Sequence, residues 1–155
     1  MSYYSTCSPN PERPETLAKL VAYVNGKRWW HCPPRDPDAY RLRGKFFASS
    51  YQEAEFYGRP LDQSERVRIH NPVVGDEEAI LTELFGSATA IAGLNEHEGE
   101  RAIQARFALD TKMRARAVEL GYDAIILMTP AGHAEYVHSG TIPHSLELNV
   151  LTLHE

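Results

Sequence analysis

Two repeating patterns of hydrophobic and polar residues divide the chain into helices and strands. The first helical pattern covers residues 14–26, where apolar side chains follow the i, i+3, i+4, i+7 spacing of an amphipathic helix: Leu17, Leu20, Val21 and Val24. Pro14 suits the first turn of that helix, where its missing N–H is no loss, and Gly26 suits the position after the cap. Two further helices are predicted over residues 76–85 and 98–120, each followed by a glycine.

Another helix is predicted to begin after Ser50. Ser50 and Glu53 have the spacing of a capping box, in which the serine side chain accepts a hydrogen bond from a backbone N–H of the first turn. That helix would carry Ala54 and Tyr57 on neighbouring turns, because residues three apart share one helix face.

Short runs rich in apolar and aromatic residues predict the strands. They cover residues 3–6, 27–32, 45–48, 66–70, 123–128, 134–137 and 146–153. The run at 66–70 alternates as a half-buried strand does, and Asn71 and Pro72 are expected to end it. Strands and helices do not alternate one by one. We therefore predict a single mixed α/β, or α+β, domain over residues 1–155 with a largely antiparallel sheet.

The composition indicates an ordinary folded protein. Of its 155 residues, 43% are hydrophobic, which suffices for one packed core. No apolar run approaches the roughly 20 residues that span a bilayer, so no membrane association is expected. The N-terminus lacks the basic and apolar segments of a signal peptide, and Cys7 and Cys32 are too few for a disulfide framework. We therefore expect reduced cysteines and a cytoplasmic location.

Charge and motifs exclude several classes of function. The net charge of −5, without a basic block, argues against general charge-driven binding to nucleic acid, although it leaves room for a small basic groove. Neither a dinucleotide-binding GxGxxG motif nor a P-loop is present. The spacing of His133, His138 and His144 matches no zinc signature, so no metal site is expected. Trp29 and Trp30 are expected to pack in the core or at its rim.

A resemblance to a known family begins at residues 44–50, which read GKFFASS and are followed by Ala54, Tyr57 and Gly58. An aromatic strand, a small hydroxyl residue, a capped helix and a second aromatic therefore follow one another. In this order the segment resembles diphtheria-toxin-like and PARP-like ADP-ribosyltransferases.

Three later stretches extend the resemblance toward the C-terminus. VRIHNPVVG at 67–75 and ELGYD at 119–123 are similar to segments of small phage and bacterial members of that superfamily. HSLEL at 144–148 resembles the strand that carries the family's glutamate. The resemblance implies the split sheet of the ADP-ribosyltransferase fold. It also implies an enzyme that uses NAD as co-substrate.

The resemblance also implies where NAD would bind. Phe46 and Tyr57 would clamp the nicotinamide ring, with Phe47 and Ser49 beside them. Aromatic walls suit a flat ring, because stacking adds roughly 0.5–1.5 kcal/mol beyond the buried area.

Glu147 is the catalytic carboxylate that the resemblance implies. Nicotinamide leaves NAD through an oxocarbenium-like transition state, whose positive charge a carboxylate stabilises. Strand alternation would turn Leu146 and Leu148 to the core and Glu147 to the cleft. An ordinary glutamate pKa of about 4.3 gives the ionised form at neutral pH, so no unusual environment is expected. Glu135 is the alternative carboxylate.

The family's first-strand position, a histidine followed by small residues, has two candidates. One is Tyr4, with Ser5 and Thr6 beside it, and the other is His31 in the segment RWWHC. Tyr4 has the right surroundings and His31 the right residue type, so both stay open. With Tyr4 in that position the chain departs from the family's His-Tyr-Glu pattern.

The expected function is therefore that of a glycosyltransferase, an NAD-dependent ADP-ribosyltransferase that modifies a protein or a nucleic acid, with NAD glycohydrolase activity beside it. Small members of the superfamily are often toxins, effectors or phage-related proteins, which implies a host target or an antitoxin as partner. The alternative is a non-catalytic binding module on the same fold.

Overall fold

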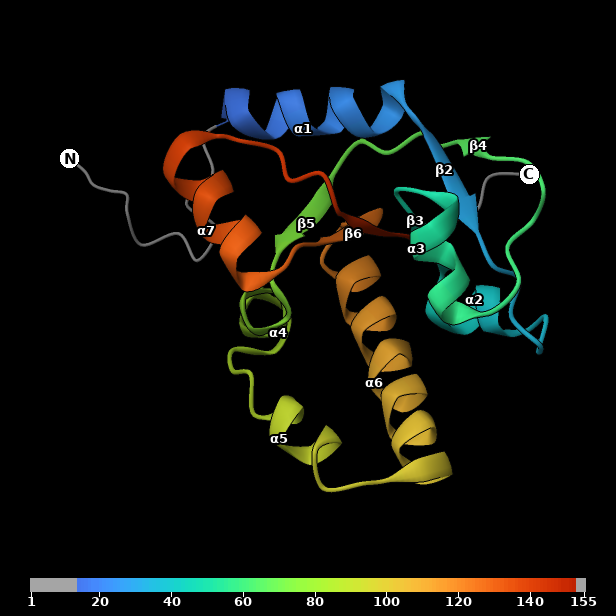
Figure 1. The fold of residues 1–155 in the computed structure, drawn as a ribbon. Helices are drawn as coiled ribbons and strands as arrows, with labels where there is room; N and C mark the ends of the chain where they lie inside the picture. The colour runs from blue at the N-terminus through green and yellow to red at the C-terminus, as the bar shows by residue number, and fades with distance from the viewer. Residues whose placement is uncertain (1–13, 153–155) are drawn as a thin grey trace.

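The computed structural model describes residues 14–152 and has a mixed α+β fold (Figure 1). Its open sheet has six strands: β2 (Arg28–His31), β3 (Lys45–Ala48), β4 (Glu65–Arg66), β5 (Pro72–Gly75), β6 (Ala124–Leu127) and β7 (Glu147–Val150). They lie in the order β4-β2-β3-β7-β6-β5. Every neighbouring pair is antiparallel except β5 and β6, which are parallel. The predicted α+β class with a largely antiparallel sheet is confirmed.

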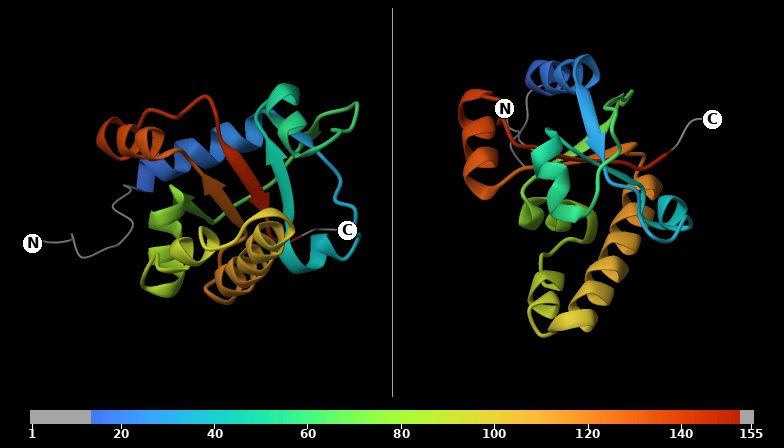
Figure 2. Two further views of the ribbon diagram at one scale, coloured as in Figure 1. Left: turned by 60° about the horizontal axis from the view of Figure 1, so that its bottom comes forward. Right: turned by 45° about the vertical axis from the view of Figure 1, so that its right-hand side comes forward.

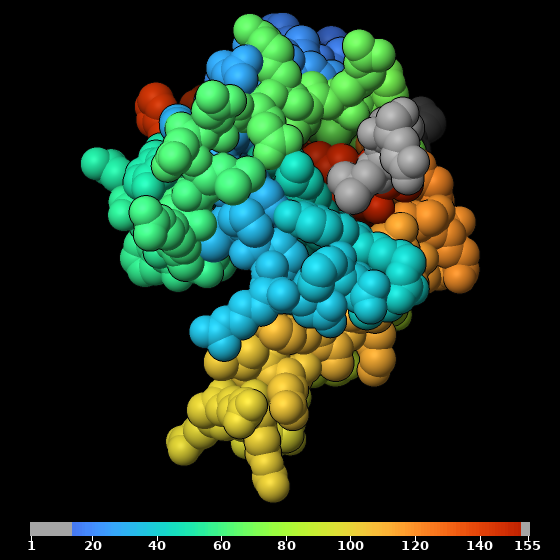
Figure 3. Space-filling model, turned by 90° about the vertical axis from the view of Figure 1, so that its right-hand side faces the viewer, coloured from blue at the N-terminus to red at the C-terminus, as the bar shows by residue number. Residues whose placement is uncertain are grey.

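Helices cover both faces of this sheet (Figure 2). They are α1 (Pro14–Gly26), α2 (Ala39–Arg43), α3 (Tyr51–Ala54), α4 (Glu77–Phe85), α5 (Ala90–Leu94), α6 (Gly99–Glu119) and α7 (Pro130–Ser139), with a 3-10 turn, η1 (Glu55–Tyr57), directly after α3. The predicted helices correspond to α1, α3, α4 and α6. The Ser50 side chain accepts from the Glu53 N–H at 3.2 Å, as the capping-box spacing indicated. Figure 1 shows α5 and the start of α6 lying away from the sheet, and in Figure 3 the yellow segment that contains the start of α6 projects from the rest of the molecule.

Strand alternation gives the sheet two separate hydrophobic cores. On one face, side chains such as Val74, Ile126 and Leu148 pack against α1 and α7. On the other, Val73 and Ile125 pack against α4 and α6. Glu147 and Asn149, the residues on either side of Leu148, therefore point toward the α6 side of the sheet.

The predicted strand at 66–70 was wrong beyond Arg66. Ile69 is fully buried, as the alternation indicated, but its backbone pairs with a side chain instead of a strand. Asn25 accepts from the Ile69 N–H at 2.8 Å and donates to its carbonyl at 2.9 Å. The Asp123 carboxylate accepts from the next two backbone N–H groups. The backbone is thus satisfied without a ladder.

Two other expectations are corrected. Pro72 was expected only to end a strand, but it is the first residue of β5, a strand that the sequence did not predict. Proline is tolerated there because β5 lies at the edge of the sheet. Residues 134–137 lie in helix α7 instead of a strand. The Thr129 side chain caps this helix by accepting from the Gly132 N–H at 3.0 Å. The predicted strand at 3–6 lies outside the described residues.

Within residues 14–152, no helix is both long and apolar enough to cross a membrane.

Candidate functional site

Glu147 begins β7 and is set between two neighbouring strands. It is paired in register with Ala48 of β3 on one side and Leu127 of β6 on the other. Leu146 and Leu148 are 2% and 0% exposed. Burial of these leucines fixes the strand's rotation, so the Glu147 carboxylate points to the opposite face, as the alternation indicated.

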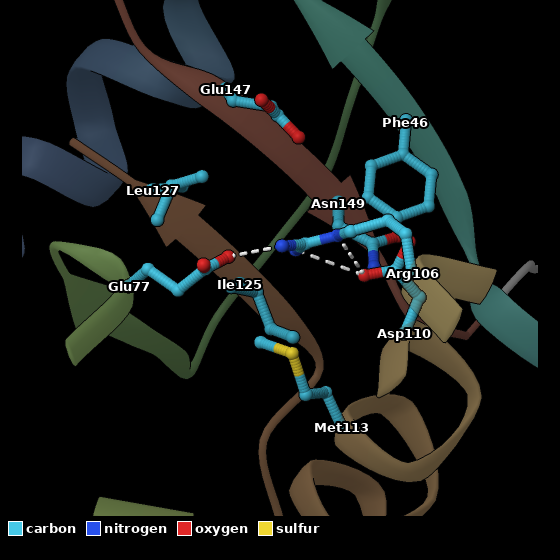
Figure 4. Close-up of a pocket in the computed structure, with 9 residues that line it drawn as sticks. All are labelled: Phe46, Glu77, Arg106, Asp110, Met113, Ile125, Leu127, Glu147 and Asn149. Carbon is cyan, nitrogen blue, oxygen red and sulfur yellow. Dashed lines mark hydrogen bonds and ion pairs between the residues drawn. The ribbon is translucent and has the colours of Figure 1, made fainter. Parts of the chain in front are cut away.

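Two aromatic side chains lie on the same face of the sheet as Glu147. The Tyr57 hydroxyl, at the end of η1, donates to Glu147 Oε2 at 2.9 Å. Phe46 of β3 lines a small cavity together with Glu147 (Figure 4). Residues 90 positions apart in the chain are thereby joined, because the Ser50 cap starts α3 where β3 ends.

A half-buried ion-pair network lies next to the carboxylate. Arg106 reaches from α6 and donates to Glu77 Oε2 at 2.5 Å and to Asp110 Oδ1 at 3.1 Å (Figure 4). Asn149 closes the wall, with its side-chain amide donating to the Arg43 carbonyl at 2.9 Å. The cavity between these residues is about 20 Å³, room for about one water molecule.

A wider hollow of about 520 Å³ adjoins this cavity and shares Glu77, Leu127 and Glu147 with it. It lies beyond the carboxyl ends of the parallel strands β5 and β6, where α4 and α7 begin. Its other lining residues are Asp76, Glu78, Ile91, Met128, Thr129, Pro130 and Ser145. The lining thus has four carboxylates and no lysine or arginine. Its volume is within the usual range of small-molecule sites.

The surroundings of Glu147 are not the ordinary ones that the sequence suggested. Burial raises the pKa of its carboxyl, and the negative charges of Asp110 and Glu77 raise it further. The hydrogen bond from Tyr57 and the positive charge of Arg106 act in the opposite direction and favour the carboxylate. The site therefore holds a carboxylate against an unfavourable environment, a feature common at functional sites.

The partners of Glu147 are perturbed as well. Burial raises the pKa of Tyr57 to about 12, with Glu147 as the next cause, so this phenol stays protonated and remains a donor at neutral pH. Burial also raises the pKa of Asp110, while Arg106 beside it lowers it. The network is therefore coupled through Arg106.

His31 faces away from this site. It pairs in register with Phe47, so both side chains lie on the α1 side of the sheet, opposite Glu147. His31 is 3% exposed, with Nδ1 2.7 Å from the Phe46 carbonyl oxygen and Nε2 2.8 Å from the Tyr40 hydroxyl. A carbonyl only accepts, so Nδ1 carries the proton and Nε2 accepts from Tyr40. Burial lowers the pKa of His31, in keeping with a neutral, structural imidazole.

Two other predicted residues hold the scaffold instead of lining the hollow. Phe47 is 4% exposed and belongs to the core under α1. The Ser49 hydroxyl donates to the Leu146 carbonyl and accepts from the Leu146 N–H, both at 3.0 Å, which ties β3 to β7. The candidates Tyr4, Ser5 and Thr6 lie outside the described residues.

The remaining candidates are placed elsewhere. Glu135 is exposed on α7. Trp29 is fully buried and donates to the Val24 carbonyl, whereas Trp30 packs edge-on against Tyr51. No group of three or more potential metal ligands occurs in the part of the chain that the structure describes.

Sequence reading missed the ion-pair network. Arg106 and Asp110 are four residues apart on a helix, and Glu77 is in the first turn of another. Such pairs are most often solvated surface pairs, and acidic residues are common at helix starts. Only the packing of α6 across the sheet reveals their common location.

Comparison with known proteins yields no relative: no protein-family model matches the chain, and neither curated proteins nor solved structures show a significant match.

Proposed function

We propose that the protein is an NAD-dependent ADP-ribosyltransferase whose site is the hollow beside Glu147. The observation that carries the proposal is the hydrogen bond from the Tyr57 hydroxyl to the Glu147 carboxylate. It joins the capped helix and the last strand, two segments whose resemblance to the family rests on separate parts of the sequence. Phe46 lies on the same side of the sheet.

The hollow has features that suit NAD. Next to the hollow, Phe46 in the wall of the adjoining small cavity and Tyr57 on the Glu147 carboxylate offer aromatic faces for the flat nicotinamide ring. The N-termini of α4 and α7, capped by Asp76 and Thr129, border the hollow, and helix starts favour anions such as a diphosphate. The carboxylates of Glu77 and Glu78 oppose an anion, so we expect modest affinity for NAD.

The chemistry follows from the carboxylate. The bond between ribose C1′ and the nicotinamide nitrogen breaks, and its electron pair leaves with nicotinamide. Glu147 stabilises the positive charge that develops on the ribose, and a fixed charge in a desolvated site is more effective than one in water. Tyr57 and Arg106 favour the ionised state of Glu147 on which this depends. An acceptor nucleophile, or water in the hydrolytic reaction, then attacks C1′.

The acidic lining favours a protein over a nucleic acid as the macromolecular acceptor, because a nucleic acid would bring further phosphates, beyond the NAD diphosphate at the helix N-termini, to a lining with four carboxylates. A host target or an antitoxin is the partner that a toxin or effector of this kind requires. We propose that the protein acts on this target in the cytoplasm.

The test is to incubate the protein with cell lysate and NAD labelled on the adenosine half. Nicotinamide release measures NAD consumption, and separate protease and nuclease digestion of the labelled product identifies the acceptor class. We expect nicotinamide release and label that protease removes. A protein that binds NAD without releasing nicotinamide contradicts the proposal.

A second function, a non-catalytic NAD-binding module on the same fold, is favoured by one observation. Of the two candidates for the family's first-strand histidine, His31 lies within residues 14–152. Its side chain faces the opposite side of the sheet, and both of its ring nitrogens are hydrogen-bonded there. Saturable NAD binding by calorimetry together with the absence of nicotinamide release would select this alternative.

A further inference from the structure

Two arginines lie directly opposite each other at one edge of the sheet. Arg28 of β2 is in register with Arg66 of the edge strand β4, and both are exposed (Figure 1). Residues in register across antiparallel strands project from the same face, where two like charges repel each other. Within the described residues, neither arginine forms an ion pair with a carboxylate. In a chain with a net charge of −5, such a pair is not explained by internal charge balance.

Both guanidinium groups are held in place by uncharged oxygens. Arg28 donates from Nε to the Ser64 hydroxyl at 2.9 Å and from Nη2 to the Ser64 carbonyl at 2.7 Å. Arg66 donates from Nη1 to the Gly26 carbonyl at 3.3 Å. These bonds leave most of the five N–H groups of each guanidinium for an incoming anion. A planar group that is already oriented loses less conformational freedom when it binds a carboxylate.

The nearest carboxylates have partners of their own. Glu65 precedes Arg66 but pairs in register with Trp29, so its side chain projects from the other face, where it forms an ion pair with Lys45 at 2.9 Å. Glu53 accepts hydrogen bonds from Ser50 and Ser145. The positive charge at the edge of the sheet is therefore available to a partner molecule.

An aromatic pair adjoins the arginines. Trp30 lies two residues after Arg28 on β2 and projects from the same face. It is half-buried and meets the exposed Tyr51 edge-on, with 5.3 Å between the ring centroids. Tryptophan, tyrosine and arginine are the residue types that most often carry the binding energy of a protein interface.

The strand register relates this surface to the candidate site. Trp30 is in register with Ala48 of β3, and Ala48 is in register with Glu147 of β7. All three therefore project from one face of the sheet. Neighbouring strands are about 4.8 Å apart, so the backbones at Trp30 and Glu147 are separated by about 10 Å. A macromolecule that places a side chain in the hollow beside Glu147 would also cover the arginines and the aromatic pair.

We propose that Arg28, Trp30, Tyr51 and Arg66 form a docking surface for an acidic segment of the acceptor protein. The identity of this partner as the acceptor rests on the proposed function. Charge favours a protein, because the arginines lie close to a hollow lined by four carboxylates. A protein can place acidic residues on the arginines and an uncharged or basic residue at the hollow, whereas a nucleic acid would bring phosphates to both.

Binding is tested first, without NAD. The probe is a fluorescently labelled random copolymer of glutamate and tyrosine, and its anisotropy is measured as protein is added. We expect saturable binding that weakens from about 0.1 M to about 1 M salt, because the Debye length falls from about 10 Å to about 3 Å. Binding that salt does not weaken overturns the role of the arginines, and this result requires no variant.

A pair of double variants then locates the binding. Arg28→Ala with Arg66→Ala should raise the Kd for the copolymer at least about tenfold, the smaller effect of losing hydrogen bonds to a charged group. Arg101→Ala with Lys112→Ala, both exposed on α6, removes the same charge and should leave the Kd unchanged. Equal losses in the two double variants, or no loss in the first, overturn the docking surface. Circular dichroism shows whether each variant is folded.

Labelling of lysate protein tests the link to the acceptor. The variant that lacks Arg28 and Arg66 should release nicotinamide from NAD alone at the wild-type rate, but should transfer at least about tenfold less label to protein per nicotinamide released. An unchanged ratio overturns the role in acceptor docking. A single-stranded oligonucleotide that binds more tightly than the copolymer, and loses affinity in the same variant, overturns the choice of a protein segment.

Failure of this inference is distinguishable from failure of the proposed function. Nicotinamide release by a protein whose copolymer binding ignores Arg28 and Arg66 overturns the docking surface alone. A protein that releases no nicotinamide overturns the proposed function and the acceptor role together. Copolymer binding still decides whether the surface accepts an acidic segment, because it requires no turnover.

Discussion

The two faces of the sheet surround a polar side chain differently: His31 is buried and Glu147 is half-buried. On the α1 face, His31 has a hydrogen-bond partner for each ring nitrogen, and burial lowers its pKa so that it stays neutral. On the α6 face, Glu147 has Tyr57 as its hydrogen-bond donor, and its pKa is raised by burial and, to a smaller extent, by the neighbouring carboxylates. One face satisfies its polar group completely, whereas the other leaves a charge that a ligand can use.

On the proposed function, this difference separates the structural His31 from the candidate catalytic Glu147, which residue type alone does not. A histidine is the more familiar catalytic group, and the sequence made His31 a natural candidate. Its complete set of partners inside a close-packed core instead indicates a role in stability. Glu147 has an unfavourable electrostatic environment at the edge of a hollow, which is the usual setting of a functional group.

The strongest effect is expected from Glu147→Gln, which keeps the size of the side chain and removes its charge. The rate of nicotinamide release should fall at least about 100-fold, the lower range for losing one electrostatic contact in a transition state. Glu135→Gln, on exposed α7, is the matched control and should be mild. A loss caused by Glu135→Gln with a normal rate for Glu147→Gln would show that the carboxylate was assigned to the wrong segment.

Tyr57→Phe should have the next largest effect, because it removes the hydroxyl and keeps the aromatic wall. We expect about a tenfold loss of rate, corresponding to about 1.4 kcal/mol, near the low end for a hydrogen bond to a charged group. Tyr57 as a whole residue is 66% exposed, which argues for the low end. The lost bond should also raise the pKa of Glu147 further. The acid limb of the pH–rate profile should then move to higher pH, and an unmoved limb would contradict the role of Tyr57.

On the other face, His31→Ala should act on stability. It leaves the Phe46 carbonyl and the Tyr40 hydroxyl without their partner, which costs roughly 1–3 kcal/mol of unfolding free energy. Urea unfolding measures this cost. Tyr40→Phe removes only one of the two bonds and should cost less, about 0.5–1.5 kcal/mol. A His31→Ala variant as stable as the wild type would contradict the role of His31 in stability.

The two faces should also respond to pH with opposite signs. His31 has a pKa below its unfolded value of 6.5, so the unfolded chain binds the proton first and stability falls as pH drops below that value. Glu147 has a pKa above its unfolded value of 4.5, so its charge costs stability at neutral pH and the cost fades as pH falls toward that value. Glu147→Gln should therefore raise the melting temperature at pH 7 and have less effect near pH 4. Thermal melts across this range check the sign, and a variant less stable than wild type at pH 7 would contradict it.

A small effect is expected from Glu78→Gln at the edge of the hollow. Removing one carboxylate near the helix start should strengthen NAD binding by about 0.3–1 kcal/mol, the range for a single charge at a helix terminus. Calorimetric titration with NAD measures the change. Glu83→Gln, on the same helix and absent from the lining of the hollow, is the control. Weaker binding by Glu78→Gln would mean that NAD does not bind at this end of α4.

Much of the fold was predictable because local signals decide it. Residues 45–48 form β3 with the predicted bounds, and the cap at Ser50 starts α3. Thr129 and Gly140 would have shown that α7 is a helix, since a capping threonine before a proline and a glycine after the last turn are helix signals. The strand β5 was missed because Pro72 reads as a breaker unless the strand is known to lie at an edge.

The candidate site was predictable only in part, for a physical reason. Alternation along β7 gave the direction of Glu147, because two neighbouring leucines must be buried. Arg106 and Glu77 approach Glu147 from helices that are distant in sequence, and no local pattern encodes that approach. Their effect on Glu147 therefore had to come from tertiary packing.

The most direct test of the difference between the two faces compares the rate of nicotinamide release in two variants. Nicotinamide release is measured for His31→Ala and Glu147→Gln side by side, per folded molecule as judged by circular dichroism. We expect His31→Ala to keep the wild-type rate at a temperature where it is folded, and Glu147→Gln to lose at least about 100-fold while fully folded. A Glu147→Gln variant that works at the wild-type rate, or a folded His31→Ala variant that releases no nicotinamide, would contradict the assignment of the site to the α6 face.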